Sequence, residues 1–457
     1  MGRGANKKVI VLMISIIFFV TIINPTTIIG IKTVNDNKTN YYKASSPINN
    51  KSWTFIVYLD GDYEDLETNM IEVLNEMELV GSTSEVNVVV QADDNGIWGN
   101  QTKRFYIEQD NDLNTIISPV VFENTSEKNM ADPQTLIDFV CWTVDNYPAE
   151  NYCLTISDHG QGWMGICFDQ TSNDKMNLEG LREAFSDIYS HLGGKKLDIV
   201  LFAACNMGMI EVFYTIKEYI DISIASEDQL TVNYISYKGI LENITNMPMI
   251  NNTEFAQKII DTSYNTIDGK FYHRYFGLYM NKIEYVKDGV NELALALLDN
   301  MPAKDQLDGI YRYSACKDGD NNIVRPHDIY RFADIISILI GGNNIKEKAI
   351  ELRNCIDPLV IRPYEGENHY VSERLNGISI YFPPDEMAYS SAYDDLNFAQ
   401  NTLWDEFLKK YYSMNRERDD FYNLFQSRFP FIYKFLNRNF LLQNIFYELL
   451  LKIKNYN

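Results

Sequence analysis

A histidine and a cysteine in this sequence have the chemistry and the setting needed for nucleophilic catalysis. His159 follows the apolar run Tyr152–Ser157, and Cys205 follows the apolar run Lys196–Ala204, 46 positions further along the chain. A histidine titrates near neutral pH and can act as a general acid or base, while a thiolate attacks carbonyl carbons readily. The pair therefore predicts a dyad in which Cys205 is the nucleophile and His159 protonates the leaving amine.

The residues around the pair favour this interpretation. Gly160 and Gly162 follow the histidine and allow another backbone to approach closely. The backbone N–H groups of Gly160 and Cys205 are predicted to stabilise the oxyanion of the intermediate. A helix is predicted to begin near Gly208, and its free N–H groups would lower the pKa of the Cys205 thiol.

The elements that position the pair follow a strand–helix–strand order. The predicted strands are Trp53–Leu59, Val86–Ala92, Tyr152–Ser157, Lys196–Ala204 and Tyr219–Ser226, and the predicted helices are Asp65–Val80, Pro133–Tyr147, Leu178–Leu192 and Met207–Lys217. This order predicts an α/β fold, a doubly wound and mainly parallel sheet with helices on both faces. Functional groups in such sheets gather beyond the carboxyl ends of the strands. Asp60, Asp158–Gly162, Cys205–Gly208 and Glu227–Asp228 occupy those positions.

The chain divides into five predicted segments. Residues 1–31 have a basic start and the apolar run Val9–Ile23, the order of a cleaved signal peptide or an uncleaved signal anchor. Residues 32–51 form a polar linker, 52–251 the α/β core and 252–414 a mixed α/β region, whose late strand Gly377–Pro384 either extends or flanks the sheet. Residues 415–457 are predicted to form an amphipathic aromatic and basic helix, which either docks on the body or lies on a membrane.

Composition narrows the classes of protein. The 457 residues carry a formal charge of −23, which excludes a general nucleic-acid binder. The six cysteines form no CxxC pair, so a zinc knuckle is excluded, and their disulfide pairing cannot be read from spacing. Neither a Walker A loop nor a dinucleotide fingerprint occurs, so no organic cofactor is expected.

The motifs around the two residues resemble the clostripain family of cysteine peptidases, in the clan of caspases, gingipains and legumains. SDHGQGWMG at Ser157–Gly165 and LFAACNMGM at Leu201–Met209 carry the resemblance, which spans most of Trp53–Pro384. It implies a caspase-like fold and an exported endopeptidase, secreted or anchored at the outer face of the membrane, that acts on peptides or proteins. It also implies calcium dependence and activation by internal cleavage, for which Lys175 is the candidate position. The alternative is a catalytically silent surface-binding or adhesion protein on the same scaffold.

The sequence departs from the family at the substrate pocket. The family usually has aspartate where this chain has Ala203, and a second acidic pocket position falls on Asn233. Without these carboxylates the preference for arginine before the scissile bond is expected to change, unless Glu227 or Asp228 takes their place.

The calcium ligands cannot be assigned from the sequence. Asp60–Glu67 and Asp318–Asn322 are acidic, but an EF-hand loop needs glycine at its sixth position, where these stretches have Asp65 and Ile323. Calcium therefore rests on the resemblance, and the metal-binding residues stay unknown.

Overall fold

The computed structural model describes residues 50–414, except 64–65, 100, 124–126, 232–233, 317–323 and 372–374. The predicted signal segment and C-terminal helix, and all but the last two residues of the predicted linker, lie outside the described residues. Within the described part, no helix is both long and apolar enough to cross a membrane.

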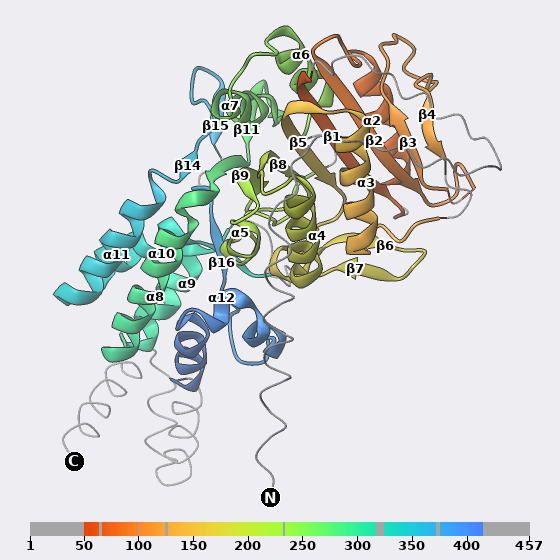
Figure 1. The fold of residues 1–457 in the computed structure, drawn as a ribbon. Helices are drawn as coiled ribbons and strands as arrows, with labels where there is room; N and C mark the ends of the chain where they lie inside the picture. The colour runs from red at the N-terminus through yellow and green to blue at the C-terminus, as the bar shows by residue number, and fades with distance from the viewer. Residues whose placement is uncertain are drawn as a thin grey trace, which may run out of the picture. The chain divides into compact units, whose positions relative to one another are not determined.

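A nine-stranded sheet forms the centre of the protein (Figure 1). Its order is β14-β12-β9-β8-β5-β1-β2-β3-β4. The strands are β1 (Lys51–Gly61), β2 (Val86–Asp94), β3 (Lys103–Tyr106), β4 (Val120–Glu123), β5 (Ala149–Ser157), β8 (Leu197–Ala203), β9 (Ile220–Ser226), β12 (Tyr275–Tyr279) and β14 (Val360–Ile361). The five predicted strands, β9, β8, β5, β1 and β2, pair in parallel, and antiparallel strands extend both edges. The predicted parallel α/β sheet is confirmed.

Helices cover both faces of this sheet because its central strands are apolar on both sides. In β1, Ile56 and Tyr58 belong to one core cluster, while Phe55 and Val57 belong to the other. The first cluster lies under α3 (Pro133–Asn146), α4 (Leu178–His191), α5 (Ile210–Ile216) and α8 (Ile283–Asp299). The second lies under α2 (Glu67–Glu78), α6 (Tyr237–Asn246) and α7 (Asn252–Thr262).

The C-terminal region adds four helices to the first cluster: α9 (Lys304–Ser314), α10 (Ile329–Leu339), α11 (Asn343–Ile356) and α12 (Asn397–Gln400). Three small sheets accompany the main one. They consist of β6 (Ile166–Asp169) with β7 (Asp174–Met176), β13 (Pro326–Asp328) with β16 (Ser379–Tyr381), and β10 (Tyr264–Ile267) with β11 (Lys270–His273) and β15 (His369–Val371). Figure 1 shows α8, α10 and α11 gathered at the end of the molecule away from β2–β4.

Two expectations about this region need refinement. The late strand flanks the main sheet: β16 pairs with β13, and Ser379 bridges to Met209 just before α5. The helix predicted to start near Gly208 begins at Ile210, because Met209 has the extended backbone that this bridge requires.

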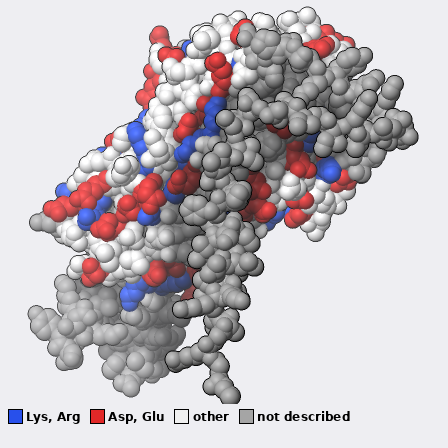
Figure 2. Space-filling view, viewed as in Figure 1, with Lys and Arg blue, Asp and Glu red and all other residues white. Residues whose placement is uncertain are grey.

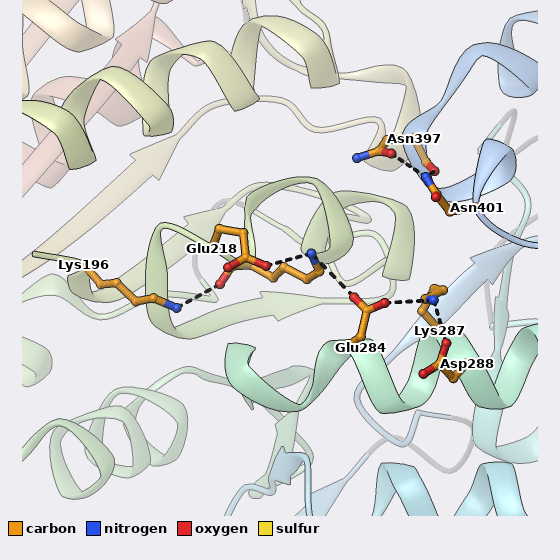
Figure 3. Close-up of polar contacts among 8 residues, drawn as sticks. Lys196, Glu218, Glu284, Lys287, Asp288, Asn397 and Asn401 are labelled. Carbon is orange, nitrogen blue, oxygen red and sulfur yellow. Dashed lines mark hydrogen bonds and ion pairs between the residues drawn. The ribbon is translucent and has the colours of Figure 1, made fainter. Parts of the chain in front are cut away.

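Glu211 connects the C-terminal region to the core. Its buried carboxylate accepts hydrogen bonds from the Tyr381 N–H at 2.9 Å and the Tyr393 hydroxyl at 2.7 Å. The half-buried Lys217 and Lys287 both contact Glu284 of α8, at 3.6 and 2.8 Å; Figure 3 labels Glu284 and Lys287. Because the Glu284 side chain is exposed to solvent, these ion pairs contribute less than the buried Glu211 contacts.

Acidic and basic side chains are interspersed over the described part of the visible surface (Figure 2). The described surface in that view shows no continuous basic stripe.

Replacing Tyr393 with phenylalanine should destabilise the protein, because the Glu211 carboxylate loses a buried hydrogen-bond donor. The expected loss is about 1–3 kcal/mol, seen as a lower Tm in scanning calorimetry. Tyr285→Phe is the matched control, since Tyr285 is exposed on α8. Equal Tm values for the two variants would contradict this role of Tyr393.

Candidate active site

His159 lies in the loop that follows β5. The strand ends at Ser157, which pairs with Ala203 at the end of β8. The imidazole is half-buried and has two aromatic neighbours, with centroid distances of 4.8 Å to Tyr63 and 6.5 Å to Phe168, both edge-on. The closer ring, that of Tyr63, restricts its movement.

Cys205 lies in the turn between β8 and α5. Its half-buried sulfur accepts a hydrogen bond from the Leu230 N–H at 3.2 Å and lies 3.7 Å from the Leu230 carbonyl oxygen. Leu230 belongs to the loop after β9, so neighbouring strands of the sheet hold the thiol in place.

The histidine loop and the cysteine turn are in direct contact. A Cβ atom on Gly160 would lie 2.3 Å from the Cys205 carbonyl oxygen and 3.0 Å from its backbone nitrogen, so only glycine fits there. The His159 and Cys205 side chains line one cavity at the carboxyl ends of the parallel strands. The structure thus brings His159, Gly160 and Cys205 together, as the strand order predicts.

The predicted helix effect on the thiol is wrong. Burial is the main cause of a raised pKa for Cys205, and the Asp228 and Asp158 carboxylates add to it. The Leu230 N–H and the Arg274 guanidinium act in the opposite direction. The N–H of Gly208 donates instead to the Ser226 carbonyl at 2.7 Å, and α5 starts only at Ile210, too far along to stabilise a thiolate. In the free protein the thiol form is favoured.

The cavity beside Cys205 is lined largely by apolar side chains. Ala203, half-buried, is among the lining residues. The apolar wall consists of Leu59, Leu66, Met70, Val73, Leu230, Tyr234, Ile235, Tyr237 and Tyr275. Asp60 and Asp158 also line the cavity, but both are nearly inaccessible to solvent. Burial, then the Asp158 charge, raises the pKa of Asp60 well above its usual range.

The other predicted pocket residues lie elsewhere. Glu227 is buried away from the cavity lining, where it accepts the N–H groups of Asn376 and Gly377. Asp228 is also outside the lining and lies 3.4 Å from Arg274. Neither replaces the carboxylate that is missing at Ala203. Glu227 faces the C-terminal region, and Asp228 is paired with Arg274. Asn233 lies outside the described residues.

Lys175 lies in β7, paired with Phe168 of β6. Its ammonium is 3.5 Å from the Gln161 side-chain oxygen and 5.6 Å from the centre of the Phe168 ring. The preceding turn, residues 171–174, is exposed. The predicted cleavage position therefore lies on a hairpin next to the histidine loop.

A cluster of carboxyl groups lies near the two aromatic neighbours of His159. Asp62, Asp93, Glu127 and Asp169 each place one oxygen within 4.8 Å of the others. Burial is the main cause of pKa values raised to about 7 for Asp62 and about 8 for Asp93, and the Asp169 carboxyl raises both further. Of this set, only Asp62 lies in an acidic stretch noted in the sequence, Asp60–Glu67. The other three are far apart along the chain, and only the fold brings them together.

Comparison with known proteins gives the family. The model of the clostripain family matches residues 57–411, most of the chain. The chain belongs to the clostripain family. Clostripain from Hathewaya histolytica is 22% identical over 449 residues, which covers 83% of this chain and 84% of that protein. This family membership makes the protein a cysteine endopeptidase.

Solved structures of clostripain-type proteases have the same fold. A secreted C11 cysteine protease from Bacteroides thetaiotaomicron, in complex with an irreversible peptide inhibitor, superposes with a TM-score of 0.57 at 19% identity, covering 78% of this chain and 99% of that one. An inactive zymogen C11 protease from Parabacteroides distasonis gives 0.55 at 18% identity, with coverages of 77% and 98%. These likenesses show the caspase-like fold predicted from the sequence.

The six cysteines are all free thiols in the structure. Cys153, Cys167 and Cys316 are buried in the interior, so none of them can replace Cys205 at the cavity.

Alkylation of Cys205 should report its raised pKa. Since the thiol form is favoured by burial, modification by iodoacetamide should be slow at pH 7 and should rise only above the titration range of an ordinary thiol, about pH 8.5. Mass spectrometry of the Cys205 peptide across a pH series measures the rate. A titration midpoint well below that of a model thiol would contradict the raised pKa of Cys205.

Gly160→Ala should reduce peptide hydrolysis by about 100-fold, because the added methyl group pushes the histidine loop away from Cys205. Gly309→Ala on α9 is the matched control, since a Cβ there meets no atom within 4 Å. Circular dichroism should show that both variants fold. Full activity in Gly160→Ala would show that the contact between the two loops is dispensable.

Proposed function

We propose that Cys205 and His159 form the catalytic dyad of this endopeptidase. The supporting observation is the contact of Gly160 with the Cys205 backbone, which places both side chains on one cavity. The other five thiols lie outside the lining of that cavity.

The residues suit acyl transfer. The Cys205 thiol gives its proton to His159, and the thiolate attacks the substrate carbonyl to form a tetrahedral intermediate. The N–H groups of Gly160 and Cys205 are the proposed donors to its oxyanion. The intermediate collapses to a thioester, the amine leaves with the proton from His159, and water then releases the acid with His159 acting as base.

Separate removal of the two groups tests the dyad. Cys205→Ala should abolish hydrolysis, and His159→Ala should lower kcat by at least about 100-fold. Cys141→Ala, a half-buried thiol on α3, and His191→Ala, an exposed histidine on α4, are matched controls that should keep activity. Hydrolysis retained by Cys205→Ala would refute the proposal.

We further propose that the pocket prefers uncharged side chains before the scissile bond. Ala203 supplies no carboxylate to the lining, and the two carboxyl groups that do line the cavity, Asp60 and Asp158, are nearly inaccessible to solvent. Asp228 is paired with Arg274, and Glu227 faces away from the cavity. The apolar wall formed by α2 and Tyr275 can bury an aliphatic or aromatic side chain.

Ala203→Asp should shift the preference towards arginine and lysine, because a carboxylate would then face the bound side chain. A peptide library that varies the residue before the cut measures this, with the wild-type protein as the reference. A wild-type preference for arginine would overturn the proposed pocket.

The same proposal includes export, calcium dependence and internal processing. The basic start and the apolar Val9–Ile23 run support export, with the mature protein secreted or anchored at the outer face of the membrane through this segment or residues 415–457. The acidic cluster supports a calcium ion, because carboxylate oxygens are its preferred ligands. The exposed hairpin supports cleavage at Lys175.

A further inference from the structure

Arg274 is the single residue that joins β11 to β12. Because Tyr275 of β12 lies opposite Ser226 of β9 in an antiparallel pair, Arg274 is brought beside the loop that follows β9. The chain before Arg274 is also fixed, since β11 is hydrogen-bonded to both β10 and β15 in a second sheet. The backbone of Arg274 is therefore held by strands on either side of it in the chain.

The guanidinium of Arg274 contacts three residues of the loop after β9. Its Nη1 donates to the Gln229 carbonyl at 2.6 Å and lies 3.4 Å from the Asp228 carboxylate. The guanidinium carbon lies 5.4 Å from the centre of the Tyr234 ring, within the range of a cation–π interaction. The Arg274 side chain is 21% exposed and that of Asp228 only 1%, so water and salt screen their attraction weakly.

The same loop is attached to the turn that carries Cys205. The backbone N–H of the residue after Cys205 donates to the Asp228 carbonyl at 3.1 Å, and the Leu230 N–H donates to the Cys205 sulfur at 3.2 Å. Gln229 lies between these two points of attachment, and its carbonyl is the group that Arg274 binds. Arg274 therefore holds the middle of a short segment whose two ends contact the cysteine turn.

Asp228 places a buried negative charge near the thiol, and Arg274 offsets it. Burial is the largest cause of the raised pKa of Cys205, and the Asp228 charge adds to it, whereas the Arg274 guanidinium acts in the opposite direction. A cation beside a buried carboxylate reduces the repulsion that a forming thiolate would meet. The other ionisable groups around the thiol are Asp158, His159 and Tyr275. Of all these groups, Arg274 is the permanent cation.

We propose that Arg274 is a positioning residue for Cys205. It holds the loop after β9 so that the Leu230 N–H meets the sulfur, and it offsets the buried Asp228 charge beside the forming thiolate. Arg274 lies outside the lining of the cavity, so it acts through the loop rather than on the substrate. Its effect on the thiol follows from these contacts, whereas its effect on hydrolysis rests on the proposed dyad.

Alkylation of the full chain tests the charge. In Arg274→Gln, iodoacetamide should modify Cys205 about 10-fold more slowly at about pH 8, because no opposite charge then favours the thiolate. Adding Asp228→Asn to this variant removes the uncompensated carboxylate and should recover most of the lost rate. Arg182→Gln, which loses an exposed ion pair with Glu179 on α4, is the matched control and should react like the wild type.

Mass spectrometry of the Cys205 peptide measures these rates. A charge effect slows the reaction, whereas a loop that is merely loosened would expose the thiol and speed it. An Arg274→Gln rate equal to or faster than that of the wild type, or no recovery in the double variant, would overturn the charge role of Arg274.

Amide hydrogen exchange tests the positioning without using the thiol or the activity. In Arg274→Gln, the Leu230 amide should exchange at least about 10-fold faster, because a loop held by fewer contacts opens more often. Peptides from α4 should exchange as in the wild type, which shows that the fold is intact. Arg274→Lys keeps the charge without the planar fork and should fall between the two. Unchanged exchange at Leu230 in Arg274→Gln would overturn the positioning.

Peptide hydrolysis measures the consequence for the proposed dyad. Arg274→Gln should lower kcat/KM by about 10-fold at neutral pH, in step with the slower alkylation. Slower alkylation with unchanged kcat/KM would overturn the effect on catalysis. Failure of the dyad itself would appear separately, as hydrolysis retained by Cys205→Ala, and would leave the alkylation and exchange results unaffected.

Discussion

The parallel pairing of β5 with β8 is the constraint on which the site depends. Ser157 lies opposite Ala203, so the loops that follow the two strands leave the sheet side by side. Gly160 then brings the histidine loop onto the Cys205 backbone, where any larger residue would collide. The buried strands supply the rigidity, because apolar side chains fix them from both faces. The two residues of the proposed dyad are therefore positioned by the core, although both lie in loops.

Acidic groups surround this edge of the sheet and shape its chemistry. Burial and nearby carboxylates favour the neutral thiol of Cys205, so the proposed mechanism begins with proton transfer from this thiol to His159. The same acidity provides the four oxygens of the proposed calcium site, two of which adjoin the aromatic neighbours of the histidine. A bound cation would reduce the repulsion between the four carboxylates, and it would also order the adjoining histidine loop.

Much of this arrangement could be predicted from the sequence, because continuous apolar runs identify buried parallel strands and the dyad follows two of them. The antiparallel strands β3, β4 and β14 could not be predicted, because they are short and show no distinct periodicity of apolar residues. The prediction that a helix N-terminus lowers the pKa of the Cys205 thiol is wrong, because Met209 is held in an extended conformation by Ser379 and the helix begins only after it. That contact joins segments that are distant in the sequence. Asp93, Glu127 and Asp169 were missed for a similar reason: only the tertiary fold brings them to Asp62.

The central claim is that the contact between these two loops creates a reactive thiol at Cys205. Treatment of the full chain with a peptidyl acyloxymethyl ketone, followed by peptide mass mapping, tests it most directly, because the thiolate must displace the acyloxy group to form a thioether. The account predicts an adduct at Cys205 alone among the six cysteines, formed much more slowly in His159→Ala. An adduct at another cysteine, or equal rates with and without His159, would contradict it.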